Sequence, residues 1–337
     1  MRFKNIFFAA AAAMALTACS SDDAIETVQQ KSQFPEDGVM RFTTNLVDPT
    51  IATTRASITG SDVNQNGQQF QVKIVNPTSA TYSYFNTVQY DGTEWTPINR
   101  MLWQNDQQSI TVTAAYKQDK TFSDYEFIVG ANLTVAADQS TEAKLKQQDL
   151  LTMPTKTIAN PSIEETLMQN GKLVINFYHA LTKLDVTLEL KDEFYPANIQ
   201  ASDITEFTIK GTNAGYQFKA METANENYGT VTVTASTAAD ILANQYNFTA
   251  GTAESKHSTA KYEAIIVPQT IAAGQLTVSF KIGTRSFSWT NTQAYTLEQG
   301  KQYTLPLTVG NDGVTAGSRA FTVTSWEDQP GGNLGTE

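Results

Sequence analysis

Apolar and polar residues alternate along most of the chain. In the segment 40–46, Met40, Phe42, Thr44 and Leu46 fall on one face, and Arg41, Thr43 and Asn45 on the other. A period of two is typical of a β-strand with one buried face. The pattern recurs in short segments, which lie at 70–76, 81–86, 109–117, 125–130, 172–190, 207–211, 230–236, 262–268, 276–282, 285–290, 303–310 and 319–326. Many short strands without a βαβ rhythm predict an all-β fold of two tandem antiparallel β-sandwiches.

The phase of this alternation reverses once within the stretch 172–190. Leu173 and Phe177 have odd numbers, whereas Leu184 and Leu190 have even numbers. A bend or bulge is therefore expected between the two halves. An Asn-Pro and an Asn-Gly pair interrupt the pattern just upstream, at 160–161 and 170–171. They place the predicted domain boundary there, with sandwiches at 56–170 and 171–337.

Composition supports folded domains and excludes some partners. The chain has 337 residues, of which 40% are hydrophobic, and a net charge of −11. That length suits two domains with packed cores. An acidic balance without a basic run argues against nucleic acid as a partner and against a polybasic membrane patch.

The first residues predict export. Arg2 and Lys4 precede the apolar stretch Ile6–Leu16, which is too short to span a bilayer. The sequence LTAC then resembles the lipobox of bacterial lipoproteins, and Cys19 is the only cysteine. We therefore expect a signal peptide at 1–18 and acylation of Cys19 by palmitate and related chains. The polar segment 20–38 is expected to be a tether.

Residues with catalytic potential are few. The chain has only two histidines, of which His179 falls in a strand pattern and His257 in a polar loop. Packing is the favoured interpretation for His179 and solvation for His257. None of the common hydrolase, metalloprotease or phosphate-binding motifs occurs. We therefore predict a non-enzymatic protein without a cofactor.

One segment has the spacing of a calcium loop. Asp62, Asn64 and Asn66 stand at alternate positions before a glycine, but Lys73 occupies the twelfth position, where a bidentate glutamate belongs. A turn is the favoured interpretation, and no metal site is predicted.

Several segments together resemble one known family. They are MRFTTNL and TTRA at 40–56, QDLLTMP at 148–154, FYHALTKLDVTLEL at 177–190, LEQGKQYTLPLTVGNDG at 297–313 and FTVTSW at 321–326. In this order they resemble the fimbrillin family, the type V pilins and related surface lipoproteins of Gram-negative anaerobes. The resemblance runs from Cys19 to Trp326. It implies two transthyretin-like sandwiches in tandem.

The family resemblance also implies a route of assembly. The lipoprotein reaches the outer membrane surface, and an arginine-specific protease cuts between Arg55 and Ala56. The cut removes residues 19–55, including a first strand whose inward side chains are Met40, Phe42 and Leu46. Another pilin subunit, of the same or another kind, fills the open groove with its C-terminal segment. The donor residues in this chain are Phe321, Val323 and Trp326. The product is a pilus, or fimbria, that serves cell adhesion.

Other interpretations remain open. Arg55 could be an ordinary linker residue, with the first strand permanently in place. The chain could be a tip subunit or a lipid-held anchor subunit of a pilus. It could also be a monomeric surface lipoprotein that binds a glycan or a host ligand.

Overall fold

The computed structural model describes residues 34–46, 58–118, 129–219, 230–234, 238–317 and 321–326. All of them belong to one of the two compact units into which the chain divides, Gln33–Glu337. The other unit, Met1–Ser32, contains none of the described residues.

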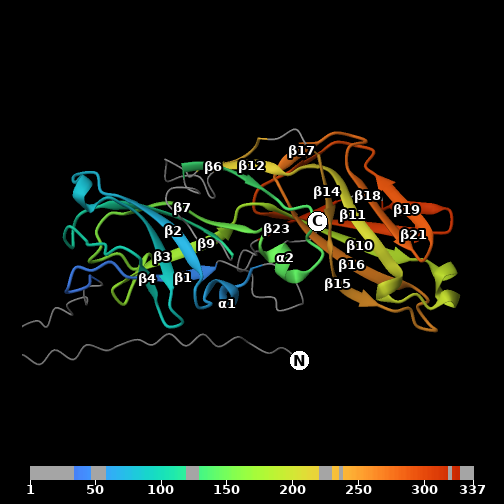
Figure 1. Cartoon of the computed structure of the whole chain (residues 1–337), viewed down its shortest axis with the longest axis horizontal. Helices are drawn as coiled ribbons and strands as arrows, with labels where there is room; N and C mark the ends of the chain where they lie inside the picture. Colours follow the sequence, from blue (N-terminus) through green and yellow to red (C-terminus); the bar gives the residue numbers. More distant parts are fainter. Residues whose placement is uncertain are drawn as a thin grey trace, which may run out of the picture. The chain divides into compact units, whose positions relative to one another are not determined.

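The described part of the chain is mostly β-structure (Figure 1). The strands are β1 (Phe42–Leu46), β2 (Gln69–Val75), β3 (Tyr84–Tyr90), β4 (Trp95–Pro97), β5 (Ile110–Lys117), β6 (Val129–Thr134), β7 (Leu150–Ile158), β8 (Met168–Gln169), β9 (Lys172–His179), β10 (Thr182–Leu190), β11 (Ile204–Asn213), β12 (Gly215–Lys219), β13 (Thr230–Val233), β14 (Ala238–Leu242), β15 (Asn244–Thr249), β16 (Ser258–Ile266), β17 (Gln269–Ile271), β18 (Thr277–Ile282), β19 (Arg285–Thr290), β20 (Tyr295–Leu297), β21 (Lys301–Gly310), β22 (Gly313–Ala316) and β23 (Thr322–Ser325). The helices are short: α1 (Gly60–Val63), α2 (Glu142–Lys146) and the 3₁₀ turns η1 (Ala80–Tyr82), η2 (Asp192–Ala197) and η3 (Ala201–Asp203). The all-β prediction is confirmed.

The largest sheet closes on itself. Its strands pair in the order β1-β4-β3-β2-β5-β7-β9-β8, and β1 also pairs with β9. The path β1-β4-β3-β2-β5-β7-β9 therefore returns to β1 and forms a ring. β1 lies among the other strands of this ring in Figure 1. A closed ring has no unpaired edge, so β1 is the strand that removes the two edges of β4 and β9.

The remaining strands form two larger sheets and two small ones, and all of them except β6 come from the second half of the chain. One sheet has the order β15-β16-β10-β21-β22, with β23 also paired to β21, and another has the order β14-β11-β18-β19. The small sheets are β13-β12-β6 and β17-β20. Apolar side chains alternate along β10, where Leu184, Val186 and Leu188 are buried in the core. This is the pattern of a sandwich with one inward face for each sheet.

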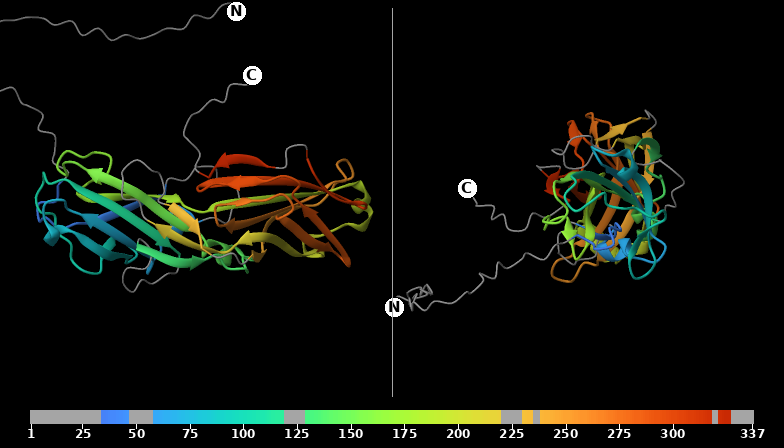
Figure 2. Two further views of the ribbon diagram at one scale, coloured as in Figure 1. Left: turned by 90° about the horizontal axis from the view of Figure 1, so that it is seen from above. Right: turned by 90° about the vertical axis from the view of Figure 1, so that its left-hand side faces the viewer.

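Two separate clusters of buried apolar side chains result. The cluster inside the ring, which we call the first core, includes Phe42, Phe70, Trp95, Ile175 and Phe177. The second core is larger and lies between the sheets of the second half. Strands coloured blue and green surround the first core, and orange and red strands contribute much of the second (Figure 2).

The reversal of phase at 172–190 is confirmed and has a simple cause. Strand β9 belongs to the ring and β10 to a different sheet, so each turns its apolar face toward a different core. The backbone of Ala180, between them, donates a hydrogen bond to the Leu150 carbonyl. Because β9 lies in the ring, the first core draws on residues beyond 170. The boundary at 170–171 and the transthyretin-like detail stay predictions.

Candidate assembly site

Strand β1 is bound along both edges. It runs parallel to β9, with the register Phe42↔Leu173 to Leu46↔Phe177, and meets β4 at Phe42↔Trp95. The Leu173 amide donates to the carbonyl of Arg41 at 2.7 Å. Just before the strand, the Met40 amide donates to the Met101 carbonyl at 3.0 Å. A strand with two neighbours contributes to two ladders, so its loss would leave two edges unpaired.

The apolar side chains of this strand fill the first core. Met40 and Phe42 are each 1% exposed, and Leu46 is partly buried against the same cluster. The Phe42 ring meets Phe70 edge-on, with centroids 6.0 Å apart. Burying a large apolar side chain contributes about 1.5–3 kcal/mol. Met40 and Phe42 together therefore contribute about 3–6 kcal/mol of gross burial.

Polar side chains on both faces of β1 make specific contacts as well. Trp95 Nε1 donates to Thr44 Oγ1 at 3.1 Å and to Asn64 Oδ1 at 2.8 Å. Asn45 Nδ2 donates to Asn176 Oδ1 at 3.2 Å, across the β1–β9 ladder. Asn64 belongs to the segment with calcium-loop spacing, and here it supports the site of β1.

The rest of that segment is also engaged in the fold. The Thr59 side chain caps the start of α1, and the backbone of Thr59 donates in return to Asp62. Asp62 also accepts a hydrogen bond from Lys146 Nζ at 3.1 Å. Within the described residues, no group of three or more histidine, cysteine, aspartate or glutamate side chains is placed to hold a metal ion.

The predicted lipidation and cleavage residues lie outside the described residues. These residues are Cys19 for lipidation and Arg55 and Ala56 for cleavage. The flanking residues are firmly placed: Leu46 ends β1, and Ile58 is completely buried in the first core. A cut after Arg55 would thus separate β1 from a chain that is anchored again three residues later.

The C-terminal segment forms a strand at an edge of the second half. β23 runs antiparallel to the first half of β21, with the register Lys301↔Ser325 to Thr304↔Thr322. Val323 is 52% exposed. Val323 is one of the predicted donor residues, and in the described chain its side chain is not buried.

Two aromatic residues just outside β23 anchor the segment. Phe321 packs edge-on against Tyr295, at 4.4 Å between centroids, and against Tyr303 at 6.2 Å. Trp326 is 4% exposed and lies flat on the His179 ring, with centroids 4.2 Å apart and planes 4° apart. The Trp326 amide donates to the Gly300 carbonyl at 2.8 Å.

His179 is packed, as predicted, and has a buried partner that the sequence did not reveal. Its Nδ1 lies 2.7 Å from Asp149 Oδ2, and both side chains are fully buried. Burial, with the nearby charge of Asp149, raises the pKa of Tyr216. Asp149 stands 30 positions before His179, and no pattern in the linear sequence links the two residues.

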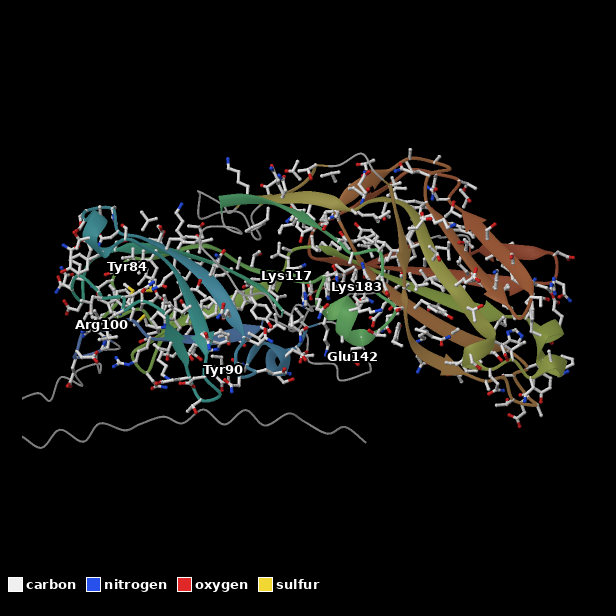
Figure 3. All side chains as sticks on the ribbon, viewed as in Figure 1. Tyr84, Tyr90, Arg100, Lys117, Glu142 and Lys183 are labelled. Carbon is white, nitrogen blue, oxygen red and sulfur yellow. The ribbon has the colours of Figure 1, made fainter. Side chains whose placement is uncertain are left out.

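Other charged residues that look like surface residues in the sequence also form pairs. Lys183, labelled in Figure 3, lies 2.6 Å from the Glu263 carboxylate, and both side chains are buried. His257, predicted to be solvated, is 41% exposed and lies between Glu189 at 2.7 Å and Asp192 at 2.5 Å. The hydrogen bond that the His257 ring donates to the Glu189 carboxylate is the main cause that raises the pKa of His257. None of these groups shares a site with β1.

The described chain is thus an all-β protein with one sheet closed by its first strand. Residues 54–326 match the family model described as fimbrillin-like, so the chain belongs to the fimbrillin-like family. No curated protein sequence matches it.

Solved structures share the fold. A protein of Bacteroides uniformis assigned to cell adhesion is 16% identical, with a TM-score of 0.53, 87% of this chain covered and 99% of that one. A protein of Bacteroides ovatus with the same assignment is 13% identical, with a TM-score of 0.57 and coverage of 86% and 98%. Among the described residues, no helix is long and apolar enough to cross a membrane.

Proposed function

We propose that this chain is a structural subunit of a cell-surface pilus, exported as a lipoprotein on Cys19 and assembled by strand exchange after cleavage between Arg55 and Ala56. Family membership and the cell-adhesion assignment of its structural neighbours support a fimbrial or adhesin-like role at the cell surface. No step of this role requires catalysis. The two halves are proposed to be transthyretin-like sandwiches.

The position of β1 carries the proposal. It closes the ring, buries Met40 and Phe42, and is followed by the segment with the predicted cleavage site. The family match begins at residue 54, after β1, and ends at Trp326. Cleavage after Arg55 would open a groove between β4 and β9 with empty apolar pockets. Such a groove binds an added strand through backbone hydrogen bonds and alternate side chains.

The proposed partner is the C-terminal segment of another pilin subunit, with Phe321, Val323 and Trp326 as its apolar side chains. In this chain's own fold the segment is held by its ladder with β21 and by its two aromatic ends, and residues 322–324 of β23 are exposed. A strand held in this way can leave at a moderate cost. The arginine-specific protease and the outer membrane are the other proposed partners.

The test compares the full chain with a chain that begins at Ala56. The full chain should remain monomeric, and the shortened chain should polymerise, as measured by light scattering. A synthetic peptide of residues 40–47 should fill the groove and stop polymerisation. A matched control peptide carries aspartate in place of Met40 and Phe42, because charged side chains cannot enter apolar pockets without a large cost.

A second comparison locates the donor. Deleting residues 319–337 from the shortened chain should abolish polymerisation and leave the groove able to bind the peptide. If the chain from Ala56 stays monomeric and as stable as the full chain, strand exchange is wrong and a ligand-binding surface lipoprotein becomes the better interpretation. If it polymerises without residues 319–337, the donor is another segment.

A further inference from the structure

Strand β9 contacts both ends of the described chain. Its residues 173–177 pair with β1, and two positions later His179 carries the stacked ring of Trp326. Leu173, Ile175, Phe177 and His179 are all buried and share one parity. The strand proposed to be removed and the strand proposed to be donated are therefore attached to one short element.

The middle of β9 depends on β1 for its backbone pairing. Strand β8 pairs with β9 at Leu173 and Lys172, and β7 pairs with it at Tyr178 and His179. In the part of the chain that the structure describes, β1 is the only strand paired with 175–177. Loss of β1 would leave these three residues without a ladder partner.

His179 lies two positions after this stretch, and few polar contacts orient its ring. Nδ1 meets Asp149, and within the described residues Nε2 has no hydrogen-bond partner. The flat stacking on Trp326 therefore depends on the backbone position of His179. Its pairing with Leu151 would remain after loss of β1, so the expected effect is a weakening of the stack and not its abolition.

We propose that β9 couples the two ends of the subunit. While β1 is paired with β9, His179 stays in position to stack on Trp326, and removal of β1 loosens the C-terminal strand β23. This inference rests on the proposed function for its biological purpose. One cleavage would then both open the acceptor groove and free the donor strand. An uncut subunit would hold its own donor strand and remain monomeric.

The test measures hydrogen exchange of the intact, uncut chain by mass spectrometry. Local opening of a strand is reported by the exchange of its amides. Phe42→Ala weakens β1, and Ile74→Ala is the matched control, since Ile74 is buried in the same core on β2, which pairs with neither β1 nor β9. The two variants are compared under conditions that give them the same free energy of unfolding. Phe42→Ala should then speed amide exchange in 322–326 about tenfold more than Ile74→Ala, a factor within the usual range of coupling between two sites.

Coupling between two sites must also be reciprocal. Trp326→Ala should therefore speed exchange in 42–46 by the same factor, whereas Val323→Ala, at an exposed position of the same segment, should leave it unchanged. If Phe42→Ala prevents folding, Leu46→Ala is the milder substitute, because Leu46 is only partly buried.

Two results overturn the inference: equal effects of Phe42→Ala and Ile74→Ala on 322–326, or unchanged exchange in 42–46 when Trp326 is replaced. Both are measured on monomers, so they are independent of polymerisation. A chain that polymerises from Ala56 without this coupling would retain the proposed function and lose the inference. Coupling in a chain that does not polymerise from Ala56 would retain the inference and lose the proposed function.

Discussion

Replacing Phe42 with alanine tests whether β1 is an integral part of the fold. Phe42 is 1% exposed, pairs with Leu173 on one side and Trp95 on the other, and meets the Phe70 ring. Replacing a buried phenylalanine by alanine costs about 3–5 kcal/mol, because the transfer free energy is lost and a cavity is left. Leu46→Ala should cost about 1 kcal/mol, since Leu46 is only partly buried.

Urea unfolding of the full chain is the assay. Circular dichroism and tryptophan fluorescence should be followed together, because the two cores could unfold in separate steps. The loss for Phe42→Ala should appear as a lower midpoint for the transition of the first core. An exposed position of β23, Val323→Ala, serves as the control and should change stability by less than about 0.5 kcal/mol.

A loss below about 1 kcal/mol for Phe42→Ala would refute the reasoning, since it lies well under the cost of emptying a buried aromatic site. It would mean that the first core is stable without β1. In that case cleavage at Arg55 would not create a strong acceptor, and β1 would be a surface strand only.

Three further predictions concern other parts of the chain. Trp326→Ala should cost about 3 kcal/mol in urea unfolding, because its ring is buried against His179. The raised pKa of His257 implies stability that is fully present below its ordinary value of 6.5 and lost as the pH rises through the raised value. The stability advantage of the wild type over His257→Gln should therefore disappear above that range, as measured by urea midpoints at several pH values. Gly211→Ala should destabilise or unfold the second half, since a Cβ there would lie 1.9 Å from a backbone oxygen and φ is +86°; thermal unfolding followed by circular dichroism would measure it.

Local patterns in the sequence were sufficient for the class of fold and for some residue environments. The alternation of apolar residues predicted strands and the inward faces of β1, β9 and β10, because side chains of a strand point to opposite faces at successive positions. The reversed phase between Phe177 and Leu184 predicted a bend or bulge, and the structure shows that the chain also passes from one sheet to another there.

Pairing between distant strands could not be predicted in this way. Alternation gives the face of a residue but not the partner of a strand, so the parallel ladder between β1 and β9 left no signal. The same holds for the buried pair of Lys183 and Glu263, whose charges usually indicate exposure.

The Val323 side chain has opposite environments in the two states of the C-terminal segment: it is exposed when β23 pairs within its own subunit and would be buried after strand exchange. Phe321 and Val323 are two positions apart, as are Met40 and Phe42, so the donor segment could place Val323 in the pocket that Phe42 leaves. In the uncut subunit Val323 is 52% exposed, and exchange would bury it. Val323→Asp should therefore leave the stability of the full chain nearly unchanged and block polymerisation of the chain from Ala56, because a buried, unpaired charge costs several kcal/mol. Thr324→Asp is the matched control at the adjacent exposed position, on the opposite face of the strand, and should still polymerise. Equal light scattering from the two variants would show that Val323 does not enter the groove.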